Sequence, residues 1–264
     1  MRYVYPVISR RAGGVSVGIN LNPNNACNWR CVYCQVPDLV RGGPPPIDLP
    51  LLEAELDGFL RWATVGDFMT TRVPADSRRL VDVAFSGNGE PTSAAEFTAA
   101  VALAGRLLAE HRLAGAMPVR VITNGSLLDR KAVQRGLALI GSMGGEVWFK
   151  LDAGSASGMA RINGSRLRPE AVARRLATCA SLASTWVQTC LFSVDGRPPE
   201  EHEQLAYLDL LLPLAPRLAG VHLYGLARPS MQPEAARLGR LPQAWMEDFA
   251  TRLRAGGLTV RVSP

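Results

Sequence analysis

Two hydrophobic periods alternate along this chain. Segments in which apolar residues recur at every second position, or that are apolar throughout, predict β-strands, and segments with apolar residues three and four apart predict helices. The predicted strands are residues 15–21, 80–85, 118–123, 146–152, 185–193, 221–225 and 258–262. The predicted helices begin at Pro50 and then cover residues 97–108, 129–139, 155–162, 169–183, 199–212 and 242–255. Ser93 and Glu96 have the spacing of a capping box before the second of these helices.

This alternation predicts βα units that build a parallel sheet. The predicted fold class is therefore α/β. We expect the sheet to curve into a partial (β/α)6 TIM-like barrel of about six units. We expect one domain over residues 1–264, with its core at about 15–230, followed by a C-terminal helix and short strand over 230–264. The proline-rich stretch 41–46 predicts a stiff spacer, either a connector or a lid over a substrate.

Composition places the chain among globular proteins. Hydrophobic residues make up 47% and charged residues 20%, which is ordinary for this class. No apolar run of about 18 residues predicts a membrane span, and the N-terminus lacks a signal peptide, so we expect a cytoplasmic protein with no membrane partner. The net charge of +6 is compatible with an RNA partner such as tRNA, but a solvated basic surface is the favoured interpretation.

Three of the five cysteines are bunched at spacings of four and three: Cys27, Cys31 and Cys34. An odd number with this clustering argues against disulfides and for metal. The three histidines lie far downstream, so no fourth ligand closes a zinc site. A cubane iron–sulfur cluster normally takes four cysteines, and three would leave one iron open to a ligand that is not protein. The other two, Cys179 and Cys190, are expected to be small buried residues.

Polar or glycine-rich signatures follow each of the first six predicted strands. In barrels of parallel strands the working residues sit at these C-terminal ends. The signatures are the three cysteines, Gly87–Asn88–Gly89–Glu90, Asn124–Gly125, Lys150 with Asp152, Ser193 with Asp195, and the stretch from Tyr224 to Arg228. We therefore expect them to share one site.

Each signature has a chemical and a structural interpretation. Gly87 and Gly89 would let backbone approach a ligand closely, and the Glu90 carboxylate would pair with an ammonium group; the alternative is a turn before a helix. Ser193 and Asp195 would reach a ribose or substrate.

Lys150 and Asp152 share a face of one strand and, if buried, should pair. Lys150 would then be a proton donor, a carboxylate anchor or, with a depressed pKa, a Schiff-base amine. The alternative is a structural ion pair. Arg228 would anchor a carboxylate, or is a surface arginine.

The CxxxCxxC loop, with Tyr33 before its last cysteine, resembles the cluster-binding loop of radical S-adenosylmethionine (radical SAM) enzymes. The resemblance extends over about residues 6–230. It is closest to the bacterial group that includes wyosine synthetases. The matching segments are Pro6–Arg11, Gly18–Leu21, Cys31–Gln35, Phe85–Thr92, Ile122–Ser126 and Lys150–Ala153.

The resemblance implies a [4Fe–4S] cluster on Cys27, Cys31 and Cys34, with S-adenosyl-L-methionine on the open iron. It also implies that Tyr33, Gly87, Asn88, Gly89, Glu90 and Asn124 face the cofactor, with Lys150, Asp152 and Arg228 nearer the substrate. Reductive cleavage by an external flavodoxin- or ferredoxin-type donor would give a 5′-deoxyadenosyl radical, which abstracts hydrogen from a small molecule or nucleotide.

Two alternatives remain beside this interpretation. One is an enzyme of the same core that modifies a peptide or protein, or an activase. The other is a non-catalytic zinc- or cluster-binding module that binds RNA. The chain lacks the cysteines for the second cluster of wyosine-forming enzymes.

Overall fold

The computed structural model describes residues 1–9 and 13–264. The chain forms two compact units. The first contains Met1–Asn28, Gly42–Thr123 and Asp129–Val147, and the second contains Trp29–Arg41, Asn124–Leu128 and Trp148–Pro264. Arg10 and Arg11 of the Pro6–Arg11 motif lie outside the described residues.

The first unit is built on four neighbouring strands in the order β1-β2-β5-β6. Their bounds are β1 (Val4–Ser9), β2 (Gly14–Ile19), β5 (Leu80–Phe85) and β6 (Val119–Thr123). β1 runs antiparallel to β2, whereas β2, β5 and β6 are parallel. The predicted parallel α/β arrangement is therefore confirmed, with an antiparallel edge strand added to it.

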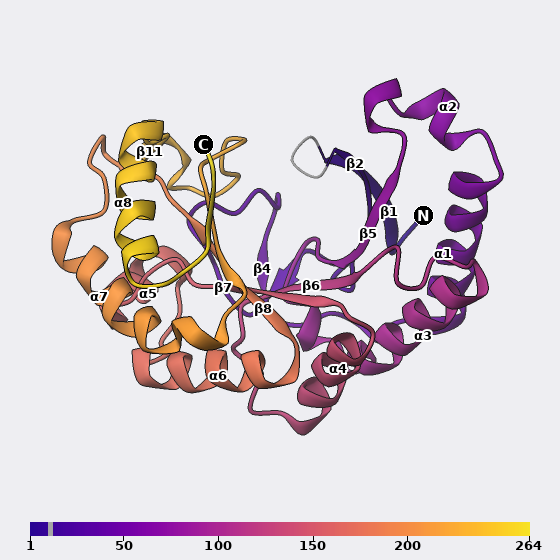
Figure 1. Cartoon of the computed structure of the whole chain (residues 1–264), viewed down its shortest axis with the longest axis horizontal. Helices are drawn as coiled ribbons and strands as arrows, with labels where there is room; N and C mark the ends of the chain where they lie inside the picture. The colour runs from indigo at the N-terminus through magenta and orange to yellow at the C-terminus, as the bar shows by residue number, and fades with distance from the viewer. Residues whose placement is uncertain (10–12) are drawn as a thin grey trace. The chain divides into compact units, whose positions relative to one another are not determined.

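Helices α1 (Leu49–Thr64), α3 (Phe97–Glu110) and α4 (Lys131–Ser142) complete this unit. Figure 1 shows α3 between the other two, and α3 contacts both. Their apolar stripes are buried, because removing apolar surface from water stabilises the fold by about 25 cal/mol per Å². The fully buried side chains include Leu52, Leu56 and Leu60 of α1. Shorter elements here are β3 (Ala26–Cys27), α2 (Phe68–Arg72), η1 (Ala75–Ser77) and η2 (Pro91–Ser93).

The second unit contains the parallel strands β8 (Ser184–Cys190), β10 (Gly220–Tyr224) and β12 (Val260–Ser263). β7 (Glu146–Lys150) leads into it, and Leu151 N donates to Gln188 O of β8 at 3.2 Å. The helices are α5 (Ala156–Asn163), α6 (Pro169–Leu182), α7 (Glu201–Leu211) and α8 (Gln243–Ala255), and Figure 1 shows α8 next to the C-terminal strand. The remaining elements are β4 (Val40–Arg41), β9 (Ser193–Val194), η3 (Leu212–Arg217), η4 (Ala235–Arg237) and β11 (Leu238–Gly239).

Local signals explain where α5 begins and ends. The Ser155 side chain accepts from Gly158 N at 2.8 Å and caps the start of the helix. Gly164 ends it in the left-handed conformation, with φ of 59°, which costs glycine least. This short helix matters because its last residue, Asn163, reaches the candidate site.

Two elements, β1 and α2, were not predicted from the sequence. β1 contains Pro6, which an edge strand tolerates. One local prediction was wrong. The Ser93–Glu96 capping box does not form, because Pro91 starts a 3₁₀ turn at 91–93 and the Ser93 hydroxyl donates to Glu90 O at 2.5 Å.

No helix within the described ranges is long and apolar enough to cross a lipid bilayer.

Candidate functional site

The boundary between the units falls inside the cysteine loop (residues 27–34), after Asn28. In the first unit, an asparagine network leads into Cys27. Asn22 Nδ2 donates to Ala26 O at 2.9 Å, and Asn88 Nδ2 donates to Asn25 Oδ1 at 2.7 Å. A Cβ on Gly89 would lie 2.2 Å from Ala26 O. The Gly87–Glu90 segment therefore packs directly against the backbone that precedes the first cysteine.

Glu90 is 3% exposed and is strongly hydrogen-bonded. Its Oε1 atom accepts from Thr92 N at 3.1 Å, from Thr92 Oγ1 at 2.5 Å and from Thr123 Oγ1 at 2.6 Å. A buried carboxylate needs such donors. They fix the rotamer of Glu90 at the start of η2, and its expected contact with a cofactor ammonium stays a prediction.

In the second unit, the later part of the cysteine loop is held by residues 230–234. Ser230 Oγ donates to Val32 O at 2.7 Å, and Gln232 Nε2 donates to Val36 O at 3.1 Å. Arg30 forms an ion pair with Glu234 at 2.7 Å. Cys34 N donates to Cys31 O at 3.0 Å, which closes a tight turn between these two cysteines. The loop thus has a defined conformation without regular secondary structure.

Asp152 is the centre of a buried polar cluster behind this turn. Its Oδ2 atom accepts from Tyr33 OH at 2.5 Å and from Asn163 Nδ2 at 2.8 Å. Its Oδ1 atom accepts from Cys190 N at 2.9 Å. Lys150 Nζ lies 3.5 Å from Oδ1, so the expected Lys–Asp pair is present. Tyr33, Lys150 and Asp152, which were predicted from separate motifs, meet here.

Lys150 is held as a cation. Its ammonium group donates to Tyr224 OH and lies over the rings of Tyr33 and Tyr224, 5.0 and 4.6 Å from their centroids. Burial by itself would lower the pKa of Lys150, but the Asp152 carboxylate and the Tyr224 hydroxyl outweigh it, so this pKa is raised. A Schiff-base role needs a depressed pKa, and this environment opposes it.

The other predicted residues lie outside the Asp152 cluster, although Asp195 lines the same cavity as Asp152. Asn124 is buried, and its Oδ1 atom accepts from Ser126 N at 3.0 Å. Ser193 is buried in β9, which pairs with β11. Asp195 is exposed, and hydrogen bonds from Arg237, at 2.6 Å, lower its pKa. Arg228 is exposed, and its backbone oxygen accepts from Gln35 Nε2. Their predicted roles stay predictions.

A cavity of about 440 Å³ lies within the second unit. Asp152 forms part of its wall, together with Phe192 and the aromatic residues Tyr207, Trp245 and Phe249. The Phe249 ring is 5.6 Å from that of Tyr207 and 5.8 Å from that of Trp245. Charged side chains, among them Arg161, Arg197, Glu200 and Glu203, also line it. Its volume lies in the range of small-molecule pockets, about 300–1,000 Å³.

Sequence reasoning missed several residues that surround the predicted motifs in each unit. They are Asn20, Asn22 and Thr92 in the first unit, and Asn163, Ser230, Gln232 and Glu234 in the second. Asn20 and Asn22 carried one signal, since Asn20 lies near the end of the first predicted strand and Asn22 directly follows it. The others lie far from the cysteines in sequence and match no spacing rule.

The donor set of the cysteine loop suits an iron–sulfur cluster. All five cysteines carry thiols rather than disulfides, and Cys27, Cys31 and Cys34 are partly exposed. Thiolates select iron–sulfur clusters and zinc. Asn163 Nδ2 lies 3.3 Å from Cys31 Sγ, as outer donors do around metal-bound sulfur. Among residues 1–9 and 13–264, no three His, Cys, Asp or Glu side chains are already gathered as a metal site.

Cys179 and Cys190 are buried, as predicted. Burial raises the pKa of each thiol to about 12. Neither is therefore a ready thiolate ligand.

Comparison with solved structures identifies the fold. The chain is similar to SuiB from Streptococcus suis bound to S-adenosylmethionine, with a TM-score of 0.58 and 10% identity, over 96% of this chain and 47% of SuiB. A second SuiB structure gives a TM-score of 0.58 and 9% identity over 93% of this chain and 47% of that one. The structure of anSMEcpe with bound AdoMet gives 0.55 and 15%, over 93% of this chain and 64% of anSMEcpe.

These similarities establish the fold alone, because each identity is 15% or lower. The chain spans about half of SuiB and less than two thirds of anSMEcpe. No protein-family model matches it. In sequence, the chain is similar to GTPase Obg of Brachyspira hyodysenteriae, with 28% identity over 136 residues. The matched segment covers 51% of this chain and 17% of that protein.

Proposed function

We propose that this chain is a radical SAM enzyme with Cys27, Cys31 and Cys34 as the ligands of one [4Fe–4S] cluster. The observation that carries the proposal is the built environment of the cysteine motif. A tight turn joins Cys31 to Cys34, and the amide of Asn163 points at the Cys31 sulfur. Two structures with a similar fold contain S-adenosylmethionine, which supports the same cofactor here.

When bound, the cluster and S-adenosylmethionine would supply a one-electron reduction and a 5′-deoxyadenosyl radical that takes hydrogen from a substrate. The residues of the chain would bind and orient. In the first unit, Gly87, Asn88, Gly89 and Glu90 would present backbone and a carboxylate to the methionine end of the cofactor. Gly89 packs against Ala26 O, which places this segment beside the backbone that leads into Cys27.

In the second unit, Lys150 would act as a fixed positive charge. Its raised pKa keeps the ammonium protonated, so it suits anchoring an anionic group better than covalent catalysis. Asp152 and Tyr33 would hold that charge in place through their contacts with it. Ser193, Asp195, Asn124 and Arg228 remain candidate contacts to cofactor or substrate.

The aromatic cavity beside Asp152 would bind the substrate. Its volume of about 440 Å³ suits a small molecule or one nucleotide-type unit. Its four aromatic side chains favour a ligand with a flat or apolar body, because such rings stack in offset or edge-on contacts. An external flavodoxin- or ferredoxin-type protein would deliver the electron.

The similarity to GTPase Obg does not lead us to propose GTPase activity for this chain. A phosphate-binding loop of the form GxxxxGK[ST] needs a lysine directly after glycine. The two lysines of this sequence, Lys131 and Lys150, follow Arg130 and Phe149. The segment that is similar to Obg therefore does not contain that motif.

Anaerobic reconstitution with iron and sulfide tests the function. We expect about four irons per chain, and 5′-deoxyadenosine and methionine after dithionite and S-adenosylmethionine are added. Cys31→Ala should lose both the iron and the cleavage. Cys179→Ala makes the same chemical change at a buried site in α6 and should keep both.

Other outcomes would reassign the chain. One zinc per chain and no iron would favour the RNA-binding module. A full cluster that turns over only with a peptide or protein present would favour the peptide-modifying alternative. Iron retained at the wild-type level in Cys31→Ala would refute the ligand assignment.

A further inference from the structure

The C-terminal end of α5 forms hydrogen bonds with the cysteine loop on both sides of Cys31. Arg30 N donates to Asn163 O at 3.1 Å, and Val32 N donates to Ile162 O at 2.8 Å. The last carbonyls of a helix lack partners inside the helix. Here two of them are satisfied by the residues that flank Cys31, and this fixes the cysteine against the helix end.

The side chain of Asn163 completes the contact. It is 1% exposed. Its Nδ2 atom lies 3.3 Å from Cys31 Sγ and 2.8 Å from Asp152 Oδ2. An amide nitrogen carries two hydrogens, so it can donate to both atoms at once.

Asp152 decides which way this amide faces. A carboxylate oxygen attracts the amide NH₂ group and repels the amide oxygen, so a flipped Asn163 would lose both hydrogen bonds and gain a repulsion. Asp152 is itself held by Tyr33 OH at 2.5 Å and by Cys190 N at 2.9 Å. The N–H donor is therefore aimed at the Cys31 sulfur before anything binds there.

We propose that Asn163 is a positioning residue that donates a hydrogen bond to the Cys31 sulfur in the cluster-bound protein and raises the reduction potential of the cluster. The inference rests on the proposed function. Reduction adds negative charge to the cluster and its sulfur ligands, and an N–H donor stabilises that state more than the oxidised one. Hydrogen bonds to sulfur are among the factors that set such potentials.

The test compares the reconstituted wild type with Asn163→Leu, which has similar size and no donor. Iron and sulfide are counted first, and the midpoint potential is then measured by a redox titration followed by electron paramagnetic resonance. We expect unchanged iron per chain and a lower midpoint potential in Asn163→Leu. Asn163→Ser, whose short hydroxyl does not reach Cys31, should show the same fall.

Ser165→Ala is the matched control. Ser165 is 4% exposed and two residues from Asn163, and its Oγ atom accepts from Leu167 N. This variant should keep the wild-type potential.

Each other result overturns one claim only. A wild-type potential in Asn163→Leu at full iron content refutes the inference and leaves the proposed function standing. Loss of iron in both Asn163 variants, with iron kept in Ser165→Ala, refutes tuning in favour of a structural role. A wild type that assembles no cluster refutes the proposed function itself.

Discussion

At the scale of single residues, Gly89 shows how closely two segments of the first unit approach. A Cβ there would lie 2.2 Å from Ala26 O and 2.7 Å from Asn22 Cγ. The first of these atoms is backbone, so it cannot move without shifting the chain that leads into Cys27. Any side chain at position 89 therefore disturbs the start of the cysteine loop.

We predict that Gly89→Ala destabilises the iron-free protein by about 1–3 kcal/mol, the usual cost of overpacking. It should also lower the amount of iron retained after reconstitution. Gly43→Ala is the control, because a Cβ there meets no atom within 4 Å. Urea unfolding of the variants measures the first effect. Equal unfolding midpoints for Gly89→Ala and wild type would refute the steric argument.

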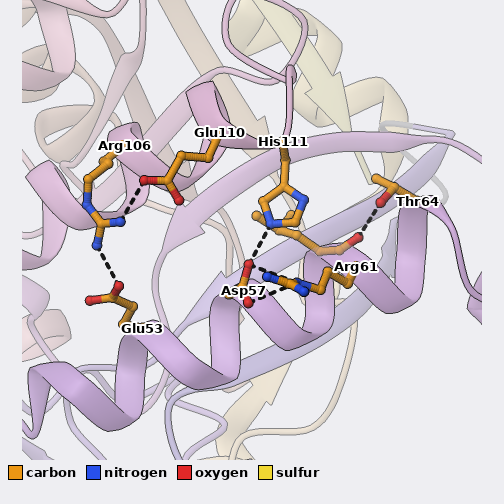
Figure 2. A network of polar contacts seen from close by, with 8 residues as sticks. Glu53, Asp57, Arg61, Thr64, Arg106, Glu110 and His111 are labelled. Atoms are coloured by element: carbon orange, nitrogen blue, oxygen red, sulfur yellow. Dashed lines mark hydrogen bonds and ion pairs between the residues drawn. The ribbon is translucent and has the colours of Figure 1, made fainter.

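At the scale of elements, α1 and α3 are joined by polar contacts as well as by their apolar faces. Figure 2 shows the network. Arg106 of α3 lies 2.8 Å from Glu53 of α1, and His111, at the end of α3, lies 2.8 Å from Asp57 Oδ1. Arg61 lies 3.0 Å from Asp57 Oδ2, one helical turn away. Asp57 thus ties the two helices together through its carboxylate.

This network predicts a small pH dependence of stability. The hydrogen bond with His111, followed by those with Arg61, lowers the pKa of Asp57 below its ordinary value of 3.8. Because the folded pKa is depressed, the stabilisation is complete above the unfolded pKa and is lost as pH falls through the folded pKa. The Asp57 side chain is partly exposed, so we expect less than about 1 kcal/mol.

The measurement is the free energy of unfolding between pH 6 and pH 2 for wild type and Asp57→Asn. The variant should lose less stability on acidification, because it has no carboxylate to protonate at this position. Asp209→Asn serves as control, since Asp209 is exposed on α7 and has no hydrogen bond or ion pair within the described parts of the chain. Parallel pH profiles for wild type and Asp57→Asn would contradict the prediction.

At the scale of the whole molecule, the proposed cluster should act as a stabilising ligand. A group that binds the native state and not the unfolded one adds RT ln(1 + [L]/Kd) to stability. The cysteine loop has no regular secondary structure between Trp29 and Val36. Cluster ligation would therefore further restrain a segment that is now held by side chains, by turns and by a few backbone hydrogen bonds, such as that from Val32 N to Ile162 O.

We predict that the reconstituted protein unfolds at a higher temperature than the iron-free protein, and that removing the iron with a chelator reverses the gain. Differential scanning calorimetry under anaerobic conditions measures both midpoints. Cys31→Ala, treated with iron and sulfide in the same way, should show no gain. An increase of the same size in Cys31→Ala would mean that iron stabilises the protein at another place.

The sequence by itself determined the order and type of most elements. Hydrophobic periodicity is a local property, so the strand at Leu80–Phe85 and the helix at Pro169 appear where their patterns predict. The cysteine motif is equally local, because three thiols within eight residues need no fold to bring them near. The burial of Cys179 and Cys190 followed from their apolar surroundings.

Only the tertiary structure decided what surrounds those cysteines. Asn163 is 132 residues from Cys31, and Glu234 is 204 residues from Arg30, yet each pair is in contact. Lys150 meets Tyr224 across 74 residues. No period or spacing encodes such contacts, because they depend on how strands pair and where helices end in space. The physical reason is that chain connectivity keeps only sequence neighbours close, whereas packing within a folded unit brings residues that are distant in sequence into contact.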